Sequence, residues 1–392
     1  MIIKEKVVPA KRITPYDAHY FYGYYDNPAM EPADRFHLAT RVSFMNRIPS
    51  ASDVAELGVI DMQNGGFELI DTTTAWNFQQ GAMLQYLYGS GGKKVIYNSF
   101  IDGEYRAVVK DLISGDKRFL DRPVANVSQD GKWGLSINFS RLFDFRPGYG
   151  YCNIPDSFYW KNHSDKDGVF LVDIETGKSK LIISYETLWE FTKGYFKGAD
   201  QKMVINHITF NTTASRFIML LRNFPPQGGK HVTALITADR NGDNLYLLSD
   251  YGIQSHYHWK DEENIIFYSD GKELDCTLGW ANNYVLKDKT QEGYLVADGF
   301  FVKDNHMSYS PDRKFYITDT YPEKERMQLL RLYNIEKNEC YDLGRFYSMP
   351  SSVTDIRCDL HPRWNCAGNA FTFDSTHEGF RAIYRMELED IL

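Results

Sequence analysis

Four histidines stand at the same position of a recurring sequence pattern. His207, His256, His306 and His361 each open a short segment that runs through a turn into an alternating strand. An imidazole exchanges protons near neutral pH and is a common ligand of divalent metal ions. If the repeat brings the four segments together, these side chains can form a site for proton transfer or for metal binding.

Further cationic side chains flank these histidines. His258 lies two residues after His256, and Arg363 lies two residues after His361, so each points to the same strand face as its histidine. Three imidazoles could hold a Zn or Mn ion, and we predict His256, His258 and His361 as the metal ligands. The pattern has no aligned carboxylate, which argues against a site of the calcium type. Binding of a carboxylate or sulfate by arginine without any metal stays open.

The elements that would position these residues are short strands in seven repeated units. The clearest unit, residues 308–344, reads as a meander of four strands separated by turns. The units begin near residues 27, 85, 126, 207, 257, 307 and 361. Most intervals are roughly 40 to 60 residues, the range of β-propeller blades. We predict an all-β, seven-bladed β-propeller of four-stranded blades, forming a single domain over residues 1–392.

Two further features of the sequence concern how the ring closes and why one interval between units is long. The last unit ends after its third strand, so the N-terminal segment KEKVVPAKRI should supply the fourth strand and close the ring. The long interval holds insertions at about 139–167, which reads as a Gly/Pro/aromatic loop, and about 186–203, which reads as a helix or lid. A pair of β-sandwiches is the main alternative, and the lack of a linker in the middle of the chain argues against it.

Composition excludes several kinds of partner. The net charge is −8 with no basic block, which argues against nucleic acid and anionic membranes as partners. The five cysteines lack CxxC spacing, which favours free thiols in a reducing compartment. The sequence shows no secretion signal and no apolar run long enough to span a membrane, so we predict a cytoplasmic protein without membrane insertion. The oligomeric state cannot be predicted.

An aromatic cluster lies near the N-terminus. The stretch DAHYFYGYYDNP, residues 17–28, combines His19 with five aromatic side chains, and tyrosine faces suit stacking on sugar rings. A strand packed between the first and last blades is the other interpretation. The sequence has no P-loop, no GxGxxG after a strand, no HExxH and no GxSxG motif, which leaves no nucleotide-binding or serine-hydrolase signature.

Long motifs throughout the chain resemble a bacterial group of seven-bladed propellers. These motifs are HYFYGYYDNP, RVSFMNRIPSASDVAELGVID, NHITFN, SHYHW, TDTYP, DLGRF, RCDLHPRWN and FDSTHEGFRAIY. Members of this group often lie beside genes for glycans or surface polysaccharides. In architecture the group is similar to two kinds of polysaccharide lyase, oligogalacturonate lyase and the ulvan lyases. The resemblance implies an acidic oligosaccharide or polysaccharide as the partner.

The resemblance also implies a metal site, with departures. In oligogalacturonate lyase, Mn is held by three histidines and one glutamine. The family's Gln-x-x-His-x-His element falls on Cys358, His361 and Arg363, so one of its histidines is kept. Another metal histidine of the family matches His256 or His258. A different metal, or none, therefore stays open.

β-Elimination from a uronate would use these residue types. The carboxylate must be neutralised, the C5 proton removed and the departing O4 protonated. We predict that Arg222 and Arg363 hold the carboxylate, that His207 is the base, and that Tyr257 or Tyr321 is the acid. The residues predicted to bind substrate are His19, Tyr25, Arg141, His306, Arg363 and His377. The alternative function is a non-catalytic propeller that binds a glycan or a protein during surface-polysaccharide synthesis.

Overall fold

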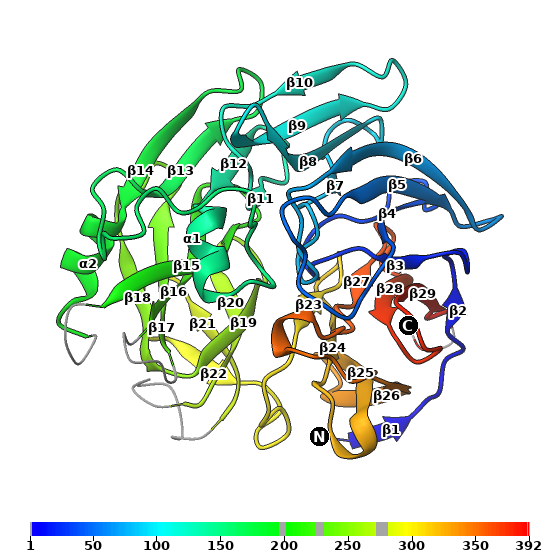
Figure 1. Cartoon of the computed structure of the whole chain (residues 1–392). Coiled ribbons are helices and arrows are strands. Elements are labelled where there is room, and N and C mark those ends of the chain that lie inside the picture. The colour runs from blue at the N-terminus through cyan, green and yellow to red at the C-terminus, as the bar shows by residue number, and fades with distance from the viewer. Residues whose placement is uncertain (1, 196–200, 225–230, 272–280, 390, 392) are drawn as a thin grey trace. The chain divides into compact units, whose positions relative to one another are not determined.

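The described residues form seven sheets, six with four strands and one with five, and the fold is a seven-bladed β-propeller (Figure 1). The computed structural model describes residues 2–195, 201–224, 231–271, 281–389 and 391. The chain divides into two compact units. One contains residues 1–100, 109–117 and 305–392, and the other contains residues 101–108 and 118–304. The prediction of one domain over the whole chain stays a prediction.

The first unit holds the N-terminal and C-terminal sheets. The first sheet has strands β3 (His19–Phe21), β4 (Phe36–Val42), β5 (Ala55–Asp61) and β6 (Gly66–Thr73). The sixth has β23 (Met307–Tyr309), β24 (Phe315–Asp319), β25 (Met327–Asn334) and β26 (Glu339–Tyr347). The seventh has β27 (Arg363–Trp364), β28 (Ala370–Ser375) and β29 (Ala382–Glu387). Single-turn 3-10 helices lie at Lys324–Arg326 and Thr354–Ile356.

The second unit holds the three middle sheets. The third sheet has β11 (Asn126–Val127), β12 (Trp133–Ser136), β13 (Gly168–Asp173) and β14 (Ser179–Ser184). The fourth has β15 (Lys202–Phe210), β16 (Arg216–Phe224), β17 (Val232–Asp239) and β18 (Tyr246–Gly252). The fifth has β19 (Gln254–Trp259), β20 (Asn264–Ser269), β21 (Asn282–Lys287) and β22 (Gly293–Leu295). The remaining sheet has β7 (Gln85–Tyr86), β8 (Lys94–Ile101), β9 (Glu104–Asp111) and β10 (Lys117–Phe119), and its residues are divided between the two units.

The N-terminal segment completes the seventh sheet, as predicted. β2 (Lys11–Arg12) pairs antiparallel with β29, where Lys11 lies opposite Arg385. The preceding strand β1 (Ile2–Glu5), which the sequence did not predict, pairs in parallel with β26 as a fifth strand of the sixth sheet. The first sheet also begins earlier than predicted, because β3 starts at His19 rather than near residue 27. The aromatic stretch therefore supplies the first strand of a blade.

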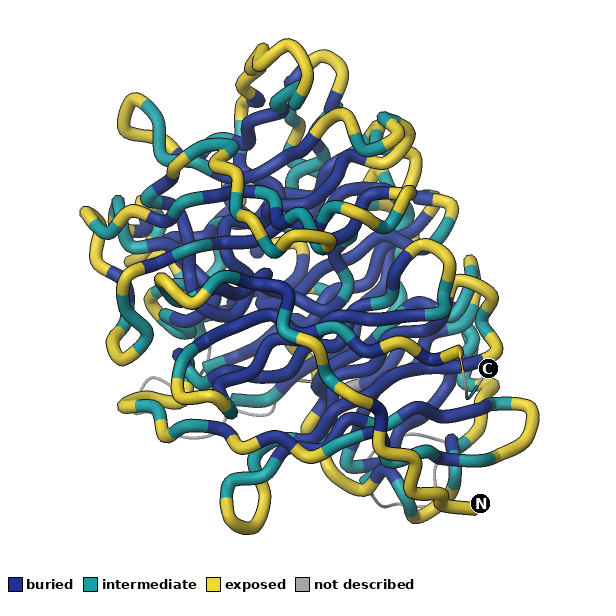
Figure 2. Tube along the Cα trace, turned by 90° about the vertical axis from the view of Figure 1, so that its right-hand side faces the viewer, coloured by how far each residue is buried: buried dark blue, intermediate teal, exposed yellow. Residues whose placement is uncertain are grey.

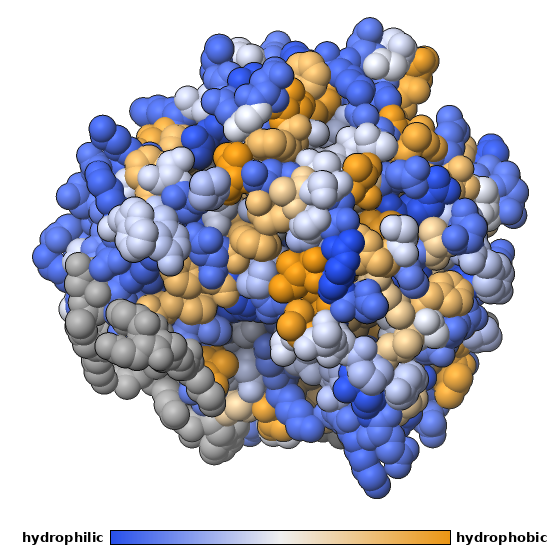
Figure 3. All heavy atoms as spheres, viewed as in Figure 1, coloured by the Kyte–Doolittle hydropathy of each residue, from blue (hydrophilic) through white to orange (hydrophobic). Residues whose placement is uncertain are grey.

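Apolar side chains fill the space between neighbouring sheets of each unit. In the first unit, Ile317 and Leu332 of the sixth sheet pack against Phe371 and Phe373 of the seventh. In the second unit, Leu220 of β16 belongs to the cluster that joins the fourth and fifth sheets. Burial runs along the strands and exposure is concentrated in the connecting loops (Figure 2). On the face drawn in Figure 3, hydrophobic side chains surface in small groups among hydrophilic ones.

Two helices lie in the predicted insertions. The segment read as a loop begins with α1 (Phe139–Phe145), because Asn138 caps the helix by accepting from the Arg141 backbone N–H. The second segment contains α2 (Tyr185–Thr192), which agrees with the predicted helix. Residues 196–200 of that segment lie outside the described residues. No helix in the described part of the chain has the length and hydrophobicity needed to cross a lipid bilayer.

Candidate functional site

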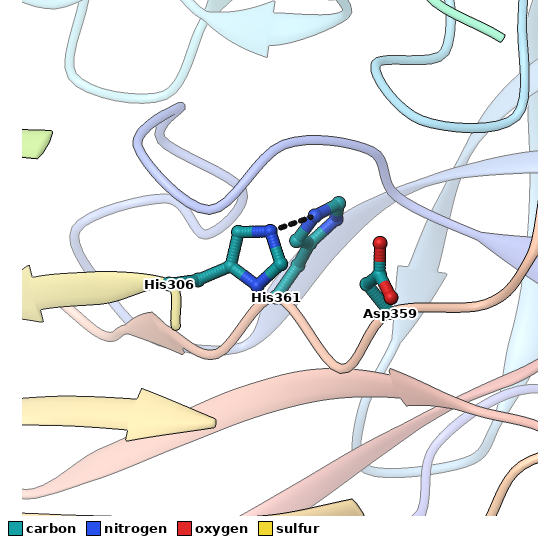
Figure 4. A group of neighbouring side chains, drawn as sticks. All are labelled: His306, Asp359 and His361. Atoms are coloured by element: carbon teal, nitrogen blue, oxygen red, sulfur yellow. Dashed lines mark hydrogen bonds between the residues drawn. The ribbon is translucent and has the colours of Figure 1, made fainter. Parts of the chain in front are cut away.

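Two histidines of the first unit meet where their sheets begin. His306 directly precedes β23, and His361 lies two residues before β27. Their side chains are buried, with 1% and 3% of the residue surface exposed. The rings meet edge to face, and their two Nε2 atoms are 3.2 Å apart (Figure 4). The shared repeat position of these two histidines therefore brings their side chains together.

The outer hydrogen bonds of the two rings determine which nitrogen carries hydrogen. His306 Nδ1 lies 2.8 Å and 3.0 Å from the two carboxylate oxygens of Asp319. His361 Nδ1 lies 2.9 Å from the carbonyl oxygen of Gly23. A carboxylate and a carbonyl accept, so both Nδ1 atoms donate. In the neutral rings, both Nε2 lone pairs then face each other across the short gap, which is unfavourable unless a proton or a cation lies between them.

A divalent ion fits this arrangement. With metal–nitrogen bonds of about 2.1 Å, adjacent ligands of one ion lie about 3.0–3.4 Å apart, which matches the separation of the two Nε2 atoms. Asp359 offers a carboxylate oxygen, and the ligand atoms of His306, Asp359 and His361 all lie within 4.8 Å of one another (Figure 4). Imidazole and carboxylate ligands together suit Zn or Mn. The residues present therefore fit the metal that the sequence resemblance implied.

Further hydrogen bonds hold these three side chains in place. Arg357 donates from Nε to Asp359 Oδ1 at 2.5 Å and from Nη2 to Oδ2 at 2.8 Å. The Asp319 carboxylate accepts from the backbone N–H of His306 at 3.0 Å and of His361 at 3.1 Å. One buried carboxylate thus ties together the two chain segments that carry the histidines, and such partners tune ligand basicity and orientation.

The backbone at the site is unusual at two positions. His361 has a positive φ of 43°, which is uncommon for a residue with a side chain and indicates local strain. Gly23 has a φ of 137°, and a Cβ there would lie 2.8 Å from the Gln80 carbonyl oxygen. Only glycine therefore fits at this position, where the Gly23 carbonyl oxygen accepts from His361.

Tyrosines surround the histidine pair. The ring centroid of Tyr25 is 5.3 Å from that of His306, and the centroid of Tyr24 is 5.1 Å from that of His361. Tyr321 is half-buried, with its ring 5.5 Å from His306 and the Arg357 guanidinium 4.4 Å over it. Of the tyrosines predicted to take part, Tyr25 and Tyr321 lie beside the histidine pair.

Arg363 lies in the core beneath this cluster. Its Nη2 donates to Asp374 Oδ1 at 2.6 Å, and only 2% of its surface is exposed. Asp374 also accepts from the Tyr22 backbone N–H at 3.2 Å, and burial raises the pKa of the Tyr22 phenol well above its ordinary value. Arg363 and Asp374 thus form a buried ion pair. The predicted binding of substrate by Arg363 stays a prediction.

The second unit holds the predicted base and two of the predicted metal ligands. The His207 ring stacks on Tyr257 with centroids 4.5 Å apart, and the Tyr257 hydroxyl donates to the Ile218 carbonyl oxygen at 3.2 Å. His256 Nδ1 lies 3.0 Å from Asp304 Oδ1, which leaves its Nε2 as the acceptor nitrogen in the neutral ring. Their predicted roles, and that of His258 beside them on β19, stay predictions.

Arg222 lies in β16 of the same unit and is buried. Together with burial, which has the largest effect, the charges of Arg222 and Arg146 lower the pKa of His231 to about 3. His231 therefore stays neutral at physiological pH. The predicted role of Arg222 in holding a carboxylate remains a prediction.

Two predicted substrate-binding residues have other surroundings. His19 lines a pocket of about 550 Å³ with Tyr16 and Phe380, and burial lowers the pKa of its ring. His377 Nδ1 lies 2.9 Å from Ser375 Oγ at the end of β28. Both lie in the first unit, and the structure does not bring either into the group of His306, His361 and Asp359.

Arg141 is fully buried in α1, and its guanidinium donates to backbone carbonyl oxygens. Nε donates to Met203 at 2.6 Å, and Nη2 donates to Asn162 at 2.6 Å. These bonds tie the insertion after α1 to β15. They describe a structural role, and the predicted binding of substrate by Arg141 stays untested.

The sequence pattern did not predict a role for Asp319 or Asp359. Asp359 belongs to the group that could hold an ion, and Asp319 accepts hydrogen bonds from both histidine segments. The signals were present, because Asp359 lies two residues before His361 and Asp319 ends the strand that follows His306. Neither carboxylate aligns with the histidines, so the repeat pattern itself does not reveal them. The predicted metal ligand His361 does lie in a group that could hold an ion, and His306 joins it there.

Comparison with known proteins supports the fold. No family model matches the chain, and no curated protein matches it. An oligogalacturonate lyase from Vibrio parahaemolyticus superposes with a TM-score of 0.67 at 13% identity, over 97% of this chain and 93% of that one. An oligogalacturonate lyase in complex with manganese superposes with a TM-score of 0.67 at 12% identity, over 99% of this chain and 98% of that one. The β-propeller domain of the Trilobed protease from Pyrococcus furiosus superposes with a TM-score of 0.53 at 9% identity, over 93% of this chain and 96% of that one. At these identities the similarity is one of fold, and it confirms the predicted resemblance at that level.

Proposed function

We propose that the protein is a lyase that cleaves uronate-containing oligosaccharides by β-elimination, with a divalent ion held by His306, His361 and Asp359. One observation carries the proposal. The acceptors on Nδ1 turn two buried imidazole lone pairs toward each other at 3.2 Å, an arrangement that a shared proton or a metal ion stabilises, and the neighbouring Asp359 carboxylate favours the ion. The shared fold with oligogalacturonate lyases supports the reaction class, and Mn is the metal named with one of them.

Elimination at C4 and C5 of a uronate needs a neutralised carboxylate, a base and an acid. When bound, the ion supplies the positive charge that makes the C5 proton acidic. Asp319 and the Gly23 carbonyl oxygen keep both histidine rings oriented with Nε2 toward the ligand side. Arg357, held on Asp359 and over Tyr321, places a second positive charge beside the same carboxylate ligand.

Tyr321 is our choice for the acid that protonates the departing O4. It is half-buried beside His306, whereas the Tyr257 hydroxyl donates to a backbone carbonyl and is 1% exposed. A phenol positioned by a cation over its ring can deliver a proton in the transition state. His207 belongs to the second unit, and its role as the base stays the sequence prediction.

The test combines metal analysis with an elimination assay on the full chain. Purified protein is loaded with Mn or Zn, and bound metal is counted for the wild type, His306→Ala and His361→Ala. His163→Ala is the control, because it removes a half-buried histidine that lies outside the ligand group. We expect one ion per chain in the wild type and the control, and loss of that ion in the two other variants.

The same proteins are then given oligogalacturonates and other uronate oligomers, and the unsaturated product is followed by its ultraviolet absorbance. We expect product with the wild type and His163→Ala only. Stoichiometric metal without product from any uronate oligomer would refute the lyase and favour a glycan-binding module. Product formation that survives in His361→Ala would show that the proposed ion site does not carry the reaction.

A further inference from the structure

A second polar pocket lies in the second unit, and none of its lining residues is a histidine. It has a volume of about 380 Å³, which suits a ligand the size of one or two sugar rings. The start of β9, the residues that precede β11, the start of α1 and the insertion around Phe158 form its walls. The residues that the argument uses are Glu104, Asp121, Arg122, Ser140, Lys166 and Asp167.

Arg122 is the unusual residue of this pocket. Its guanidinium lies 3.5 Å from the Phe170 ring centroid, and its Nε is buried without a hydrogen-bond partner. Within the part of the chain that the structure describes, its side chain makes no hydrogen bond and no ion pair. Desolvation lowers the pKa of Arg122, although the charges of Asp167 and Glu104 act in the opposite direction. The Arg122 side chain is half-buried, and its buried Nε donor is left for an acceptor that enters the pocket.

The acidic residues of the pocket already have partners. Glu104 accepts from Arg106 at 2.7 Å, and Asp121 lies 3.5 Å from Lys178 Nζ. Asp167 is buried and accepts from Asn138 Nδ2 at 2.8 Å. Lys166, at the pocket wall, forms no ion pair with any described residue. The two cations of the pocket, Arg122 and Lys166, are therefore the groups left to meet an incoming anion.

We propose that this pocket binds the carboxylate of a sugar acid, with Arg122 as the bidentate donor and Lys166 as a second cation. A guanidinium braced flat on an aromatic ring presents its donor edge in the geometry that a carboxylate accepts. Ser140 offers a hydroxyl, and Phe158 offers an apolar face, for the ring of the sugar. The choice of a sugar acid rests on the proposed function, whereas the requirement for an anion rests on Arg122 itself.

Isothermal titration calorimetry on the full chain tests the pocket, with EDTA present so that metal-dependent binding does not contribute. The probes are D-galacturonate, D-galactose and inorganic phosphate. We expect galacturonate to bind the wild type, and Arg122→Leu to weaken that binding by about tenfold or more. Lys166→Ala should weaken it less. Arg118→Leu is the matched control, because Arg118 is an exposed arginine of β10 that does not line the pocket.

Thermal unfolding without sugar separates binding from folding. Because Arg122 has no acceptor, Arg122→Leu should unfold at the wild-type temperature or above it. If that variant fails to fold, Lys166→Ala carries the test, since Lys166 is exposed. Equal galacturonate affinity in the wild type, Arg122→Leu and Lys166→Ala overturns the proposal. Phosphate or galactose binding as tightly as galacturonate overturns the assignment to a sugar acid. Galacturonate binding that depends on Arg122 in a protein without elimination activity would refute the proposed function and leave this pocket standing.

Discussion

His37 in β4 should make the protein less stable in acid, because its ring is buried in the neutral form. Its residue surface is 0% exposed, Nδ1 lies 2.6 Å from the Leu38 carbonyl oxygen, and Nε2 lies 2.9 Å from Thr372 Oγ1. The carbonyl only accepts, so Nδ1 carries the hydrogen and Nε2 accepts from the threonine hydroxyl. Burial, followed by the charge of Arg363, holds the pKa of His37 well below its ordinary value of 6.5.

The sign and size of the effect follow from proton linkage. The folded protein keeps His37 neutral, whereas the unfolded chain takes up a proton as the pH falls below about 6.5. The unfolded state therefore binds more protons in acid, and the free energy of unfolding falls as the pH falls. The limiting slope is about 1.4 kcal/mol per pH unit, so His37 alone should cost about 2 kcal/mol between pH 7 and pH 5.

Denaturant unfolding of His37→Gln at pH 7, 6 and 5 measures this contribution. Glutamine keeps an amide for hydrogen bonding and does not titrate. We expect the difference in free energy of unfolding between wild type and variant to shrink by about 2 kcal/mol from pH 7 to pH 5. Ile60→Val is the control, because buried Ile60 lies opposite His37 on β5. Its loss of about 0.5–1.5 kcal/mol should be equal at each pH. A pH-independent difference for His37→Gln would show that the ring is not held neutral.

Three further predictions concern the candidate metal site. Gly23→Ala should lower the free energy of unfolding by about 1–3 kcal/mol more than Gly91→Ala does. Both glycines have a positive φ, but a Cβ at Gly91 would meet open space. Denaturant unfolding measures both variants. Asp319→Asn should weaken ion binding by about 10–100-fold in a metal titration, because the His306 ring loses its charged acceptor; unchanged affinity would contradict the clamp. Tyr321→Phe should lower kcat by about 100-fold or more without changing ion affinity, and an unaltered kcat would remove Tyr321 as the acid.

The blade pattern could be predicted from the sequence because it depends on local chemistry. Alternating apolar residues and regular turns specify strands, and seven such units specify the propeller. The start of the first sheet was harder, since the aromatic stretch before Gly23 lacks the polar alternation of an ordinary strand. β1 pairs in parallel along an exposed edge, so no hydrophobic pattern marks it. α1 was missed because its seven residues are too few for a helical period to stand out among loop residues.

The histidines of the site were found from their repeat position, but their roles were not. His306 and His361 share one position of the repeat, and this position brings their rings together. What the rings can do depends on the groups behind them, the Asp319 carboxylate and the Gly23 carbonyl oxygen. These partners come from the end of another strand and from a loop far away in sequence. Periodicity carries no information about such contacts, because they depend on tertiary packing rather than on the register of one strand.

Asp319 holds the two histidines of the site together through four hydrogen-bond contacts. Its carboxylate accepts from the ring and the backbone of His306 and from the backbone of His361, so the end of β24 holds both ligand segments at once. A histidine pair held this way resists separation, and the bond from the His361 N–H to that carboxylate supports the strained positive φ of His361. Removal of the carboxylate should therefore release both histidines together. Loss of ion affinity in Asp319→Ala should then exceed the loss caused by Asp359→Ala, which removes a ligand but leaves the histidine pair in place.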